Sequence, residues 1–359
     1  MTMLNLYSSN FTETTQKLTE VTQNPIIGFS LTKVEENYNR IKPYLQETPC
    51  IHSTIPNALD IYLKCENLQT TKSFKLRAAL SNLLYLKEKE PLTWNFIKKN
   101  GVITASSGNF ALAMAYACNM LHLPLTVVIH DKTAAKKKEA LHKLYPSIIL
   151  ISISLPEWQE VMLQSRFTKS NAFFISGELS LHSLLGNASI GLEIEQFFHA
   201  KKIPSSEKRI IIPYGGGGLS VALGTFFKLL HPKNTIWTAE IPNGAPFHAS
   251  YLTGRPEIVD YKSSFVDGIG ASFVIPQLFY LAKEKVDHSA LTSVEEICQS
   301  IALLAEYENL IVEGAGAASL SVALHSPKIT ETTNTPTVCI LSGGNIQFED
   351  FTSLLKKKG

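Results

Sequence analysis

A lysine, two small polar turns and a run of glycines are the features of this sequence whose residue types and spacing could do chemistry. Lys75 follows Ser73 and Phe74 at the expected start of a helix, and Ser73 is the expected N-cap. A lysine in a first helical turn faces the partial positive charge of the helix dipole, which favours the neutral amine. The neutral amine is the form that makes a Schiff base with a carbonyl compound. Lys75 is therefore a candidate nucleophile, and the alternative interpretation is a solvated surface lysine.

The glycine run Gly215–Gly218 is the strongest single signal in the sequence. Four consecutive glycines carry a cost in conformational entropy that a plain turn does not require. Without side chains, consecutive backbone N–H groups can converge on one phosphate at the start of the following helix. The run therefore predicts a phosphate-binding loop.

Two further turns follow expected strands and contain serine, glycine and asparagine. The first, at 106–109, precedes an expected helix, so its backbone N–H groups could bind a carboxylate. The second, at 342–345, opens with Ser342, whose hydroxyl could donate to a ring nitrogen. The alternative for both is an ordinary glycine-containing corner without a ligand.

The elements that must position these residues alternate between strands and helices. A helix with a capping box at Thr32 and Glu35 is expected near the start. Short runs rich in Ile and Val then alternate with helical segments, as in parallel sheets buried on both faces. The runs are 61–66, 101–106, 125–130, 147–152, 209–214, 235–240 and 337–342. The expected fold class is α/β with mainly parallel sheets, which bind ligands at the carboxyl ends of their strands.

Composition and charge limit the classes of protein to which this chain can belong. The 359 residues fit two packed lobes, and 45% of them are hydrophobic. The formal net charge of +2 gives no basic field for nucleic acid, and the lysine runs 136–138 and 356–358 are interpreted as solvated. No apolar run reaches the length of a membrane span, and we expect no signal peptide at the start of the chain. Five scattered cysteines predict buried free thiols in a reducing cytoplasm: Cys50, Cys65, Cys118, Cys298 and Cys339.

Together the motifs resemble those of the fold type II pyridoxal-phosphate (PLP) enzymes, within them the threonine dehydratase, serine dehydratase and serine racemase group. The resemblance extends from about Leu31 to Gln347, in the family's order and approximate spacing. It rests on KCENLQ (64–69), SFKLR (73–77), SSGN (106–109), LGNASIGLEI (185–194), PYGGGGL (213–219), VDG (266–268), EGAGAAS (313–319) and LSGGN (341–345).

The resemblance implies a role for each candidate residue. Lys75 would form the Schiff base with PLP, and Phe74 would pack beside the ring. Asn109 would bond the 3′ oxygen of the ring, and Ser342 would face the pyridine nitrogen. The phosphate would lie on Gly215, Gly216, Gly217 and Gly218. The substrate carboxylate would lie on Ser106, Ser107, Gly108 and Asn109.

The implied reaction removes the β-hydroxyl of L-threonine, L-serine or a related 3-hydroxy amino acid and yields a 2-oxo acid and ammonia. Lys75 would act as general base, and PLP would supply the electronic chemistry. Ser107 matches the position of the second acid or base in racemases, so racemisation stays an alternative. Others are a cysteine synthase-like β-replacement enzyme, a non-catalytic PLP-binding homologue, and a Rossmann dinucleotide binder in which Glu240 ends the strand after the glycines.

The chain departs from the family pattern at a few positions. Lys72 and Ala78 stand where the family usually has glycine, and Phe110 where histidine is frequent. We expect these residues at the rim of the substrate site. Racemases of the group bind a divalent cation near the match to Glu240, but their second carboxylate falls near Pro246 here. One carboxylate is a poor site for such a cation, so we expect no metal.

The expected architecture has two lobes, is tryptophan synthase β-like, and holds PLP between the lobes. The larger lobe would comprise 1–96 and 177–359, with 1–30 as an arm or docking segment. The smaller lobe, 97–176, would move to close on substrate, as lids commonly do. We expect a homodimer or homotetramer that binds a small amino-acid substrate. We expect it to bind neither nucleic acid nor a membrane. We expect no regulatory domain after the last motif, and therefore no feedback by isoleucine.

Overall fold

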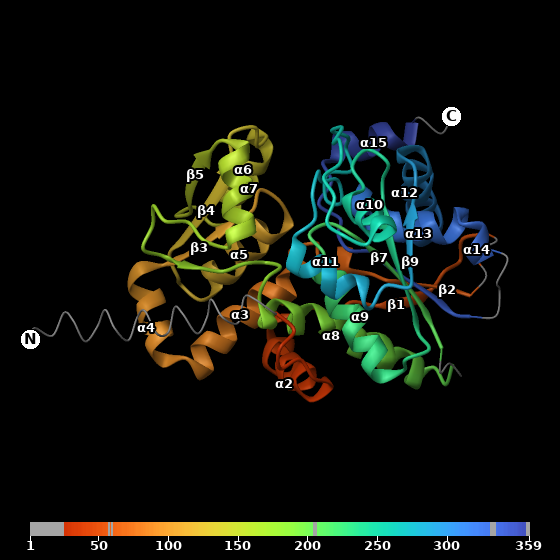
Figure 1. The fold of residues 1–359 in the computed structure, drawn as a ribbon, viewed down its shortest axis with the longest axis horizontal. Coiled ribbons are helices and arrows are strands. Elements are labelled where there is room, and N and C mark those ends of the chain that lie inside the picture. The colour runs from red at the N-terminus through yellow and green to blue at the C-terminus, as the bar shows by residue number, and fades with distance from the viewer. Residues whose placement is uncertain (1–24, 57, 59, 204–206, 331–334, 357–359) are drawn as a thin grey trace, which may run out of the picture.

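The structure is a computed structural model that describes residues 25–56, 58, 60–203, 207–330 and 335–356. Most of the expected arm, 1–30, therefore lies outside the described residues. Two sheets lie in separate halves of the molecule. Helices α3 (Lys75–Lys89) and α8 (Leu181–Ala200) run through the middle, where the halves meet (Figure 1).

The larger sheet has six strands in the order β1-β2-β10-β7-β8-β9. All neighbours are parallel except β1, which is antiparallel to β2. The strands are β1 (Cys50–His52), β2 (Ile61–Lys64), β7 (Arg209–Pro213), β8 (Thr235–Glu240), β9 (His288–Leu291) and β10 (Thr337–Ile340). Because β2, β10 and β7 are consecutive in this order, the three segments that follow them leave the sheet side by side.

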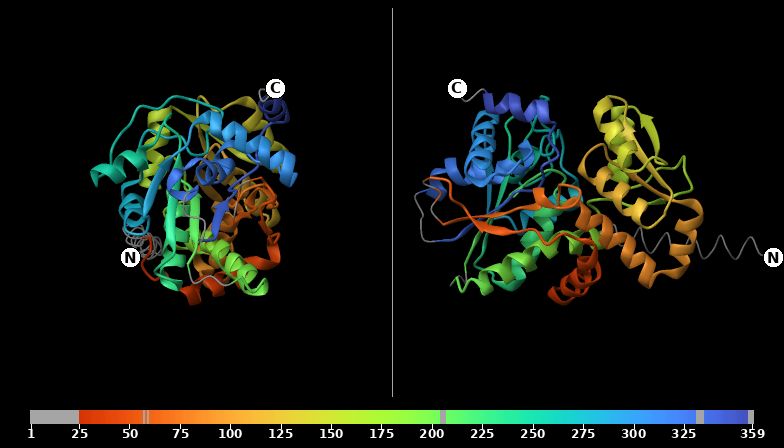
Figure 2. Two further views of the ribbon diagram at one scale, coloured as in Figure 1. Left: turned by 90° about the vertical axis from the view of Figure 1, so that its right-hand side faces the viewer. Right: turned by 180° about the vertical axis from the view of Figure 1, so that it is seen from behind.

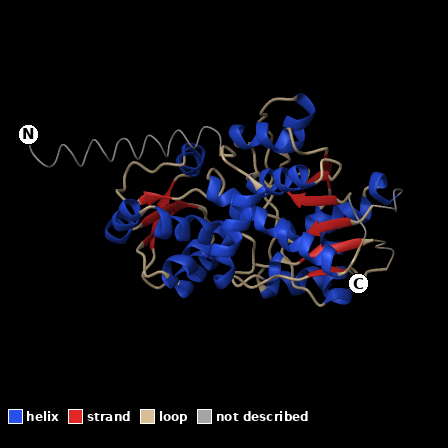
Figure 3. Ribbon diagram, turned by 90° about the horizontal axis from the view of Figure 1, so that it is seen from below, coloured by secondary structure: helices blue, strands red, loops and turns tan. Residues whose placement is uncertain are grey.

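The smaller sheet has four parallel strands in the order β5-β4-β3-β6. They are β3 (Val102–Ala105), β4 (Leu125–His130), β5 (Ile149–Ile153) and β6 (Phe173–Phe174). Figure 3 shows the strands of the two sheets as separate groups. The predicted α/β class with mainly parallel sheets is confirmed. The central strands β2, β3, β7 and β10 are buried along their whole length, which explains their apolar composition.

Helices surround both sheets (Figure 2). Those in the half with the smaller sheet are α4 (Pro91–Asn100), α5 (Asn109–Met120), α6 (Ala135–Leu144) and α7 (Leu155–Gln164). The others are α2 (Leu31–Ile41), α9 (Gly218–Leu230), α10 (Pro246–Thr253), α11 (Pro276–Lys283), α12 (Val294–Glu308), α13 (Gly314–His325), α14 (Pro327–Thr330) and α15 (Phe348–Lys356). Two short 3-10 helices are η1 (Lys42–Tyr44) and η2 (Glu66–Leu68).

Two predicted helix caps are wrong. Helix α2 starts at Leu31, because the hydroxyl of Ser30 accepts a hydrogen bond from the amide of Lys33 at 3.2 Å. Thr32 lies inside the helix and is not its cap. Helix α3 starts at Lys75, so the lysine does occupy the first turn. Its N-cap position is Phe74, and Ser73 instead forms an antiparallel bridge with Gly343.

Ion pairs join the two halves of the molecule at helix α6. Lys137 Nζ lies 2.5 Å from a carboxylate oxygen of Asp267, and Lys136 Nζ lies 3.4 Å from Glu349. Two lysines of the run 136–138 are therefore paired with acidic side chains. The division into lobes at 97 and 177 stays a prediction. None of the described helices is long and apolar enough to cross a membrane. All five cysteines are free thiols. Four of them are buried, as predicted, whereas Cys298 is only half-buried.

Candidate active site

The lysine segment and the Ser342 turn are joined by their backbones. The amide of Phe74 donates to the carbonyl oxygen of Ser342 at 3.1 Å, and the amide of Gly344 donates to that of Lys72 at 2.8 Å. This pairing follows from the sheet, since β2 and β10 are neighbours and both segments leave it at the same edge. The Lys75 side chain is 16% exposed, and its Nζ lies 4.8 Å from the centre of the Phe74 ring.

The glycine loop follows β7 and begins α9 at Gly218. Gly217 has a φ of 98°, a conformation that favours glycine. A Cβ atom at Gly215 would lie only 2.6 Å from the carbonyl oxygen of Gly268. The loop therefore needs glycine for its own backbone path, as well as for any ligand that it binds.

Glu178, which the sequence did not single out, joins Lys75 to the glycine loop. Its Oε1 forms a short ion pair with Nζ of Lys75. Its Oε2 accepts a hydrogen bond from the amide of Gly218 at 3.0 Å. Glu178 precedes helix α8 and carries no motif, so no pattern in the sequence pointed to it.

Asn109, at the start of α5, is held by a partly buried carboxylate and a second amide. Its Nδ2 donates to Glu313 Oε1 at 2.7 Å, and its Oδ1 accepts from Asn345 Nδ2 at 2.7 Å. Asn345 also donates its backbone amide to Glu313 Oε2 at 3.1 Å. Burial raises the pKa of Glu313 to about 7. Glu313 is the residue that ties the turn at 106–109 to the Ser342 turn.

The turn at 106–109 is half-buried, including Ser107. The Ser106 hydroxyl accepts a hydrogen bond from the amide of Gly108 at 3.3 Å. A Cβ atom built on Gly108 would meet no atom within 4 Å, so the backbone there borders open space. All four predicted clusters thus come together at one place, connected through Glu178, Glu313 and Asn345.

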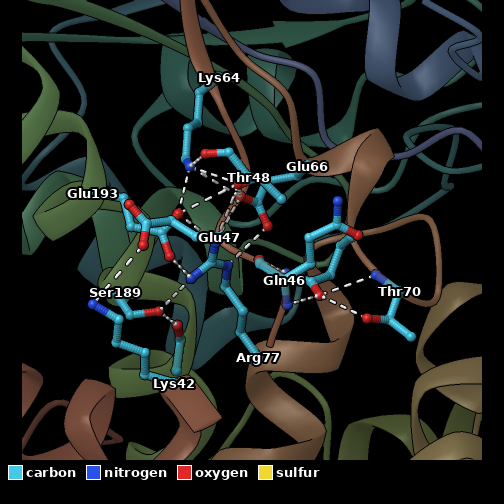
Figure 4. A network of polar contacts seen from close by, with 12 residues as sticks. Lys42, Gln46, Glu47, Thr48, Lys64, Glu66, Thr70, Arg77, Ser189 and Glu193 are labelled. Carbon is cyan, nitrogen blue, oxygen red and sulfur yellow. Dashed lines mark hydrogen bonds and ion pairs between the residues drawn. The ribbon is translucent and has the colours of Figure 1, made fainter. Parts of the chain in front are cut away.

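Helix α3 also carries Arg77, two residues after Lys75, which is part of a buried ionic network (Figure 4). Arg77 donates to Glu66 at 2.8 and 2.9 Å and to Glu193 at 2.8 and 2.7 Å. Lys64 Nζ lies 2.5 Å from Glu193 and donates to the carbonyl oxygen of Thr48. Burial alone would raise the pKa of Glu193, but Arg77 and Lys64 outweigh it and lower the pKa to about 2. The two positive charges of Arg77 and Lys64 balance the two negative charges of the glutamates. Their contacts fix α3 against β2 and α8.

The departures from the family pattern have different surroundings. Lys72 is exposed and has a φ of 56°, a left-handed conformation that glycine adopts without strain. Ala78 is fully buried in the core, so its expected place at the rim is wrong. Phe110 is also buried in this core, so its expected place at the rim is wrong as well. It lies against Gly177, where an added Cβ atom would be 2.8 Å from the ring. Phe110 therefore packs against the residue that precedes Glu178.

Glu240 is a helix cap in this structure. Its two carboxylate oxygens accept hydrogen bonds from the amides of Phe247 at 3.1 Å and His248 at 2.6 Å, in the first turn of α10. Burial raises its pKa to about 8. Among the described residues, no three or more His, Cys, Asp or Glu side chains group as they would around a metal ion. The expectation that no metal is bound stays a prediction.

The residues present fit a phosphate-bearing aldehyde cofactor. Lys75 supplies an amine beside a glycine loop at a helix start, which is where an anion binds. Three buried hydroxyls in or beside these segments, those of Ser73, Tyr214 and Ser220, have no hydrogen-bond partner in the described part of the chain. Buried hydroxyls are normally satisfied, so these are available to a bound group.

Comparison with known proteins gives the same identification. A family model described as pyridoxal-phosphate dependent enzyme matches residues 41–343. The L-threonine ammonia-lyase of Geobacter sulfurreducens is 31% identical over 91% of this chain and 78% of that protein. The solved structure of maize serine racemase superposes with a TM-score of 0.76 at 25% identity, covering 92% of this chain and 97% of that one. A solved threonine deaminase from T.th. gives a TM-score of 0.74 at 25% identity, with 89% and 99% covered.

Proposed function

The chain belongs to the pyridoxal-phosphate dependent enzyme family, and from this premise we propose that it is an ammonia-lyase. The proposed reaction converts L-threonine, L-serine or a related 3-hydroxy amino acid to a 2-oxo acid and ammonia. Relatives named L-threonine ammonia-lyase and threonine deaminase, matched over most of this chain, support this reaction. The observation that carries the proposal is the meeting of Lys75, the glycine loop and the Ser342 turn at one site.

Each predicted site residue has a role in this proposal. Lys75 would hold the cofactor, and Gly215–Gly218 would bind its phosphate through backbone N–H groups. Phe74 would pack beside the ring, since it precedes the lysine and is buried. Asn109 and Ser342 would contact the ring at its 3′ oxygen and its nitrogen. Both come from turns that the hydrogen bonds of Asn345 and Phe74 connect to the lysine segment.

The chain's own residues would perform the proton transfer and hold the substrate. The cofactor, when bound, supplies an electron sink for negative charge at the substrate α carbon. Nζ of Lys75 would take the α proton as general base. The backbone N–H groups of 106–109 would hold the substrate carboxylate beside the open space at Gly108. The Ser342 hydroxyl is a neutral donor, so it cannot give the ring nitrogen a full positive charge.

Racemisation is the second candidate, and a specific observation favours it. Ser107 lies in the same half-buried turn as Ser106 and Gly108, and solved serine racemases resemble this chain over most of its length. A hydroxyl there could return a proton to the opposite face of the α carbon. The two activities differ in their products, so one assay separates them.

The test is the release of 2-oxo acid and ammonia from PLP-loaded protein given L-threonine, L-serine and other 3-hydroxy amino acids. We expect release in equal amounts, its loss in Lys75→Ala, and its retention in Lys98→Ala, which changes an exposed lysine of α4. Formation of the D-amino acid without 2-oxo acid would favour the racemase. Consumption of an added thiol would favour β-replacement, and no product from any substrate would favour a non-catalytic homologue.

Quaternary structure and lobe movement belong to the same proposal. We propose a homodimer or homotetramer, which light scattering of the purified protein would test. We also propose that 97–176 moves towards the rest of the chain when substrate binds. The Lys137–Asp267 ion pair already joins these two parts. Identical crystal structures with and without a substrate analogue would contradict the movement.

A further inference from the structure

Glu178 occupies the place in the glycine loop where an anion is expected. The amide of Gly218, the first residue of α9, donates to its Oε2 at 3.0 Å. A Cβ atom at Gly216 would lie 2.9 Å from Cδ of Glu178, so the side chain lies against the loop itself. The Glu178 carboxylate therefore uses a donor that a phosphate on this loop would use.

The same carboxylate also engages Lys75. Its Oε1 forms the ion pair with Nζ, and the Glu178 side chain is only 11% exposed. Charge-assisted hydrogen bonds in such partly buried surroundings are stronger than those at the surface. The two groups that the cofactor needs, an amine and an anion cradle, are thus both held by one side chain.

The surroundings fix Glu178 in this position. The hydroxyl of Ser176 accepts hydrogen bonds from the amides of Glu178 at 3.3 Å and Leu179 at 3.0 Å. The preceding residue, Gly177, packs against the Phe110 ring. The corner at 176–179 therefore aims the carboxylate into the site.

We propose that Glu178 is an internal counter-anion that holds Lys75 and the phosphate cradle until the cofactor displaces it. The inference rests on the cofactor site proposed above. A carboxylate and a phosphate side by side on one helix start repel each other, so both cannot keep these contacts. Glu178 stabilises the cofactor-free protein and competes with PLP for the same donors, which weakens the apparent affinity for PLP.

The inference predicts two effects of opposite sign in Glu178→Gln. The variant keeps an acceptor for Gly218 but loses the charge that holds Lys75. Cofactor-free Glu178→Gln should melt at a lower temperature than the parent protein. It should bind PLP about tenfold more tightly, since it no longer has to break a charge-assisted pair. A residue that only supports the fold would lower both stability and affinity.

The experiment uses cofactor-stripped full-length protein, with PLP followed by its absorbance and inorganic phosphate by the shift in melting temperature. Phosphate should raise the melting temperature of Glu178→Gln more than that of the parent. Glu284→Gln, at an exposed glutamate whose ion pair is with Lys285 at 3.6 Å, is the matched control and should equal the parent. If Glu178→Gln does not fold, Glu178→Asn replaces it in the experiment, because the shorter side chain holds its amide further from Lys75.

Unchanged or weaker binding of both PLP and phosphate by a folded Glu178 variant would overturn the inference. Failure of the parent protein to bind either ligand would overturn it as well. If PLP and phosphate bind as expected but no 2-oxo acid is released, the proposed reaction fails while the inference stands. Affinity and activity therefore report on the two claims separately.

Discussion

The side-chain amide of Asn109 donates to Oε1 of Glu313 at 2.7 Å, and this contact links the two halves of the molecule at the site. Glu313 precedes helix α13 in one half, and Asn109 begins α5 in the other. Because the carboxylate takes one N–H of Asn109, the orientation of the amide is fixed. The second N–H stays available for the ring oxygen that Asn109 is proposed to contact.

The stability of the cofactor-free protein should depend on pH through Glu313. Burial raises its pKa to about 7 in the folded state, whereas an unfolded glutamate has a pKa of ~4.3. The folded state therefore holds this proton more tightly, and stability falls as pH rises from about 4.3 to about 7. Glu313→Gln removes this dependence. Between pH 4.5 and pH 8, the free energy of unfolding of the variant should therefore rise by about 2–3 kcal/mol relative to that of the parent.

The measurement is the free energy of unfolding in urea for both proteins at the two pH values. Burial also raises the pKa of Glu240, to about 8. The titration of Glu240 changes the stability of the parent and the variant equally, so it cancels in the comparison. Any lost hydrogen bond in Glu313→Gln costs the same at both pH values. A parent–variant difference that does not change with pH would contradict the assignment.

Lys72→Gly should stabilise the protein. Lys72 has a φ of 56°, and a side chain in this conformation costs about 1–2 kcal/mol that glycine avoids. Greater freedom of glycine in the unfolded chain offsets part of this, which leaves a gain of about 0.5–1 kcal/mol. The control is Lys98→Gly inside helix α4, where the same change should cost about 1 kcal/mol. Thermal unfolding of both variants checks the two opposite signs.

Much of the fold could be predicted because buried parallel strands have sequences rich in Ile and Val. All seven predicted strands are present within a few residues of their expected bounds. The three missed strands, β1, β6 and β9, have four residues or fewer and are only partly buried, so they leave no apolar run. The wrong caps at Thr32 and Ser73 have a similar cause: several Ser and Thr residues are adjacent, and tertiary contacts decide which one caps.

The site was predictable where glycine and small polar residues follow strands, since the topology of a parallel sheet brings those segments together. Its acids were not. Glu313 stands in the quoted EGAGAAS motif, directly before a helix of small residues, and that position was the available signal. Glu178 lies between elements, and only its side-chain contacts with Lys75 and Gly218 identify it.

Arg77→Leu should destabilise the protein by about 3–5 kcal/mol, because it leaves the buried carboxylates of Glu66 and Glu193 with Lys64 alone. Both carboxylates are almost fully buried and cannot be hydrated without disrupting α3. Lys169→Gln, which removes an exposed ion pair with Glu157, should cost less than about 1 kcal/mol. Urea unfolding measures both. A small effect of Arg77→Leu would mean that the network does not fix α3.

Gly217→Ala should weaken PLP binding, and Gly254→Ala should not. Both glycines have a positive φ, of 98° and 82°, so each alanine should cost about 1–2 kcal/mol of stability. Only Gly217 lies in the glycine loop, where a Cβ atom would also press on the Tyr214 hydroxyl at 2.7 Å. Titration with PLP at a temperature where both variants are folded separates the local effect from the shared strain.

The most direct test of the proposed site is to locate the lysine that carries PLP. Borohydride reduction of the PLP-loaded protein makes the bond between cofactor and lysine permanent, and peptide mass spectrometry then finds the modified residue. We expect the added mass on Lys75 and not on Lys72, three residues earlier. Modification of a different lysine, or none at all in protein that has bound PLP, would contradict the assignment of Lys75.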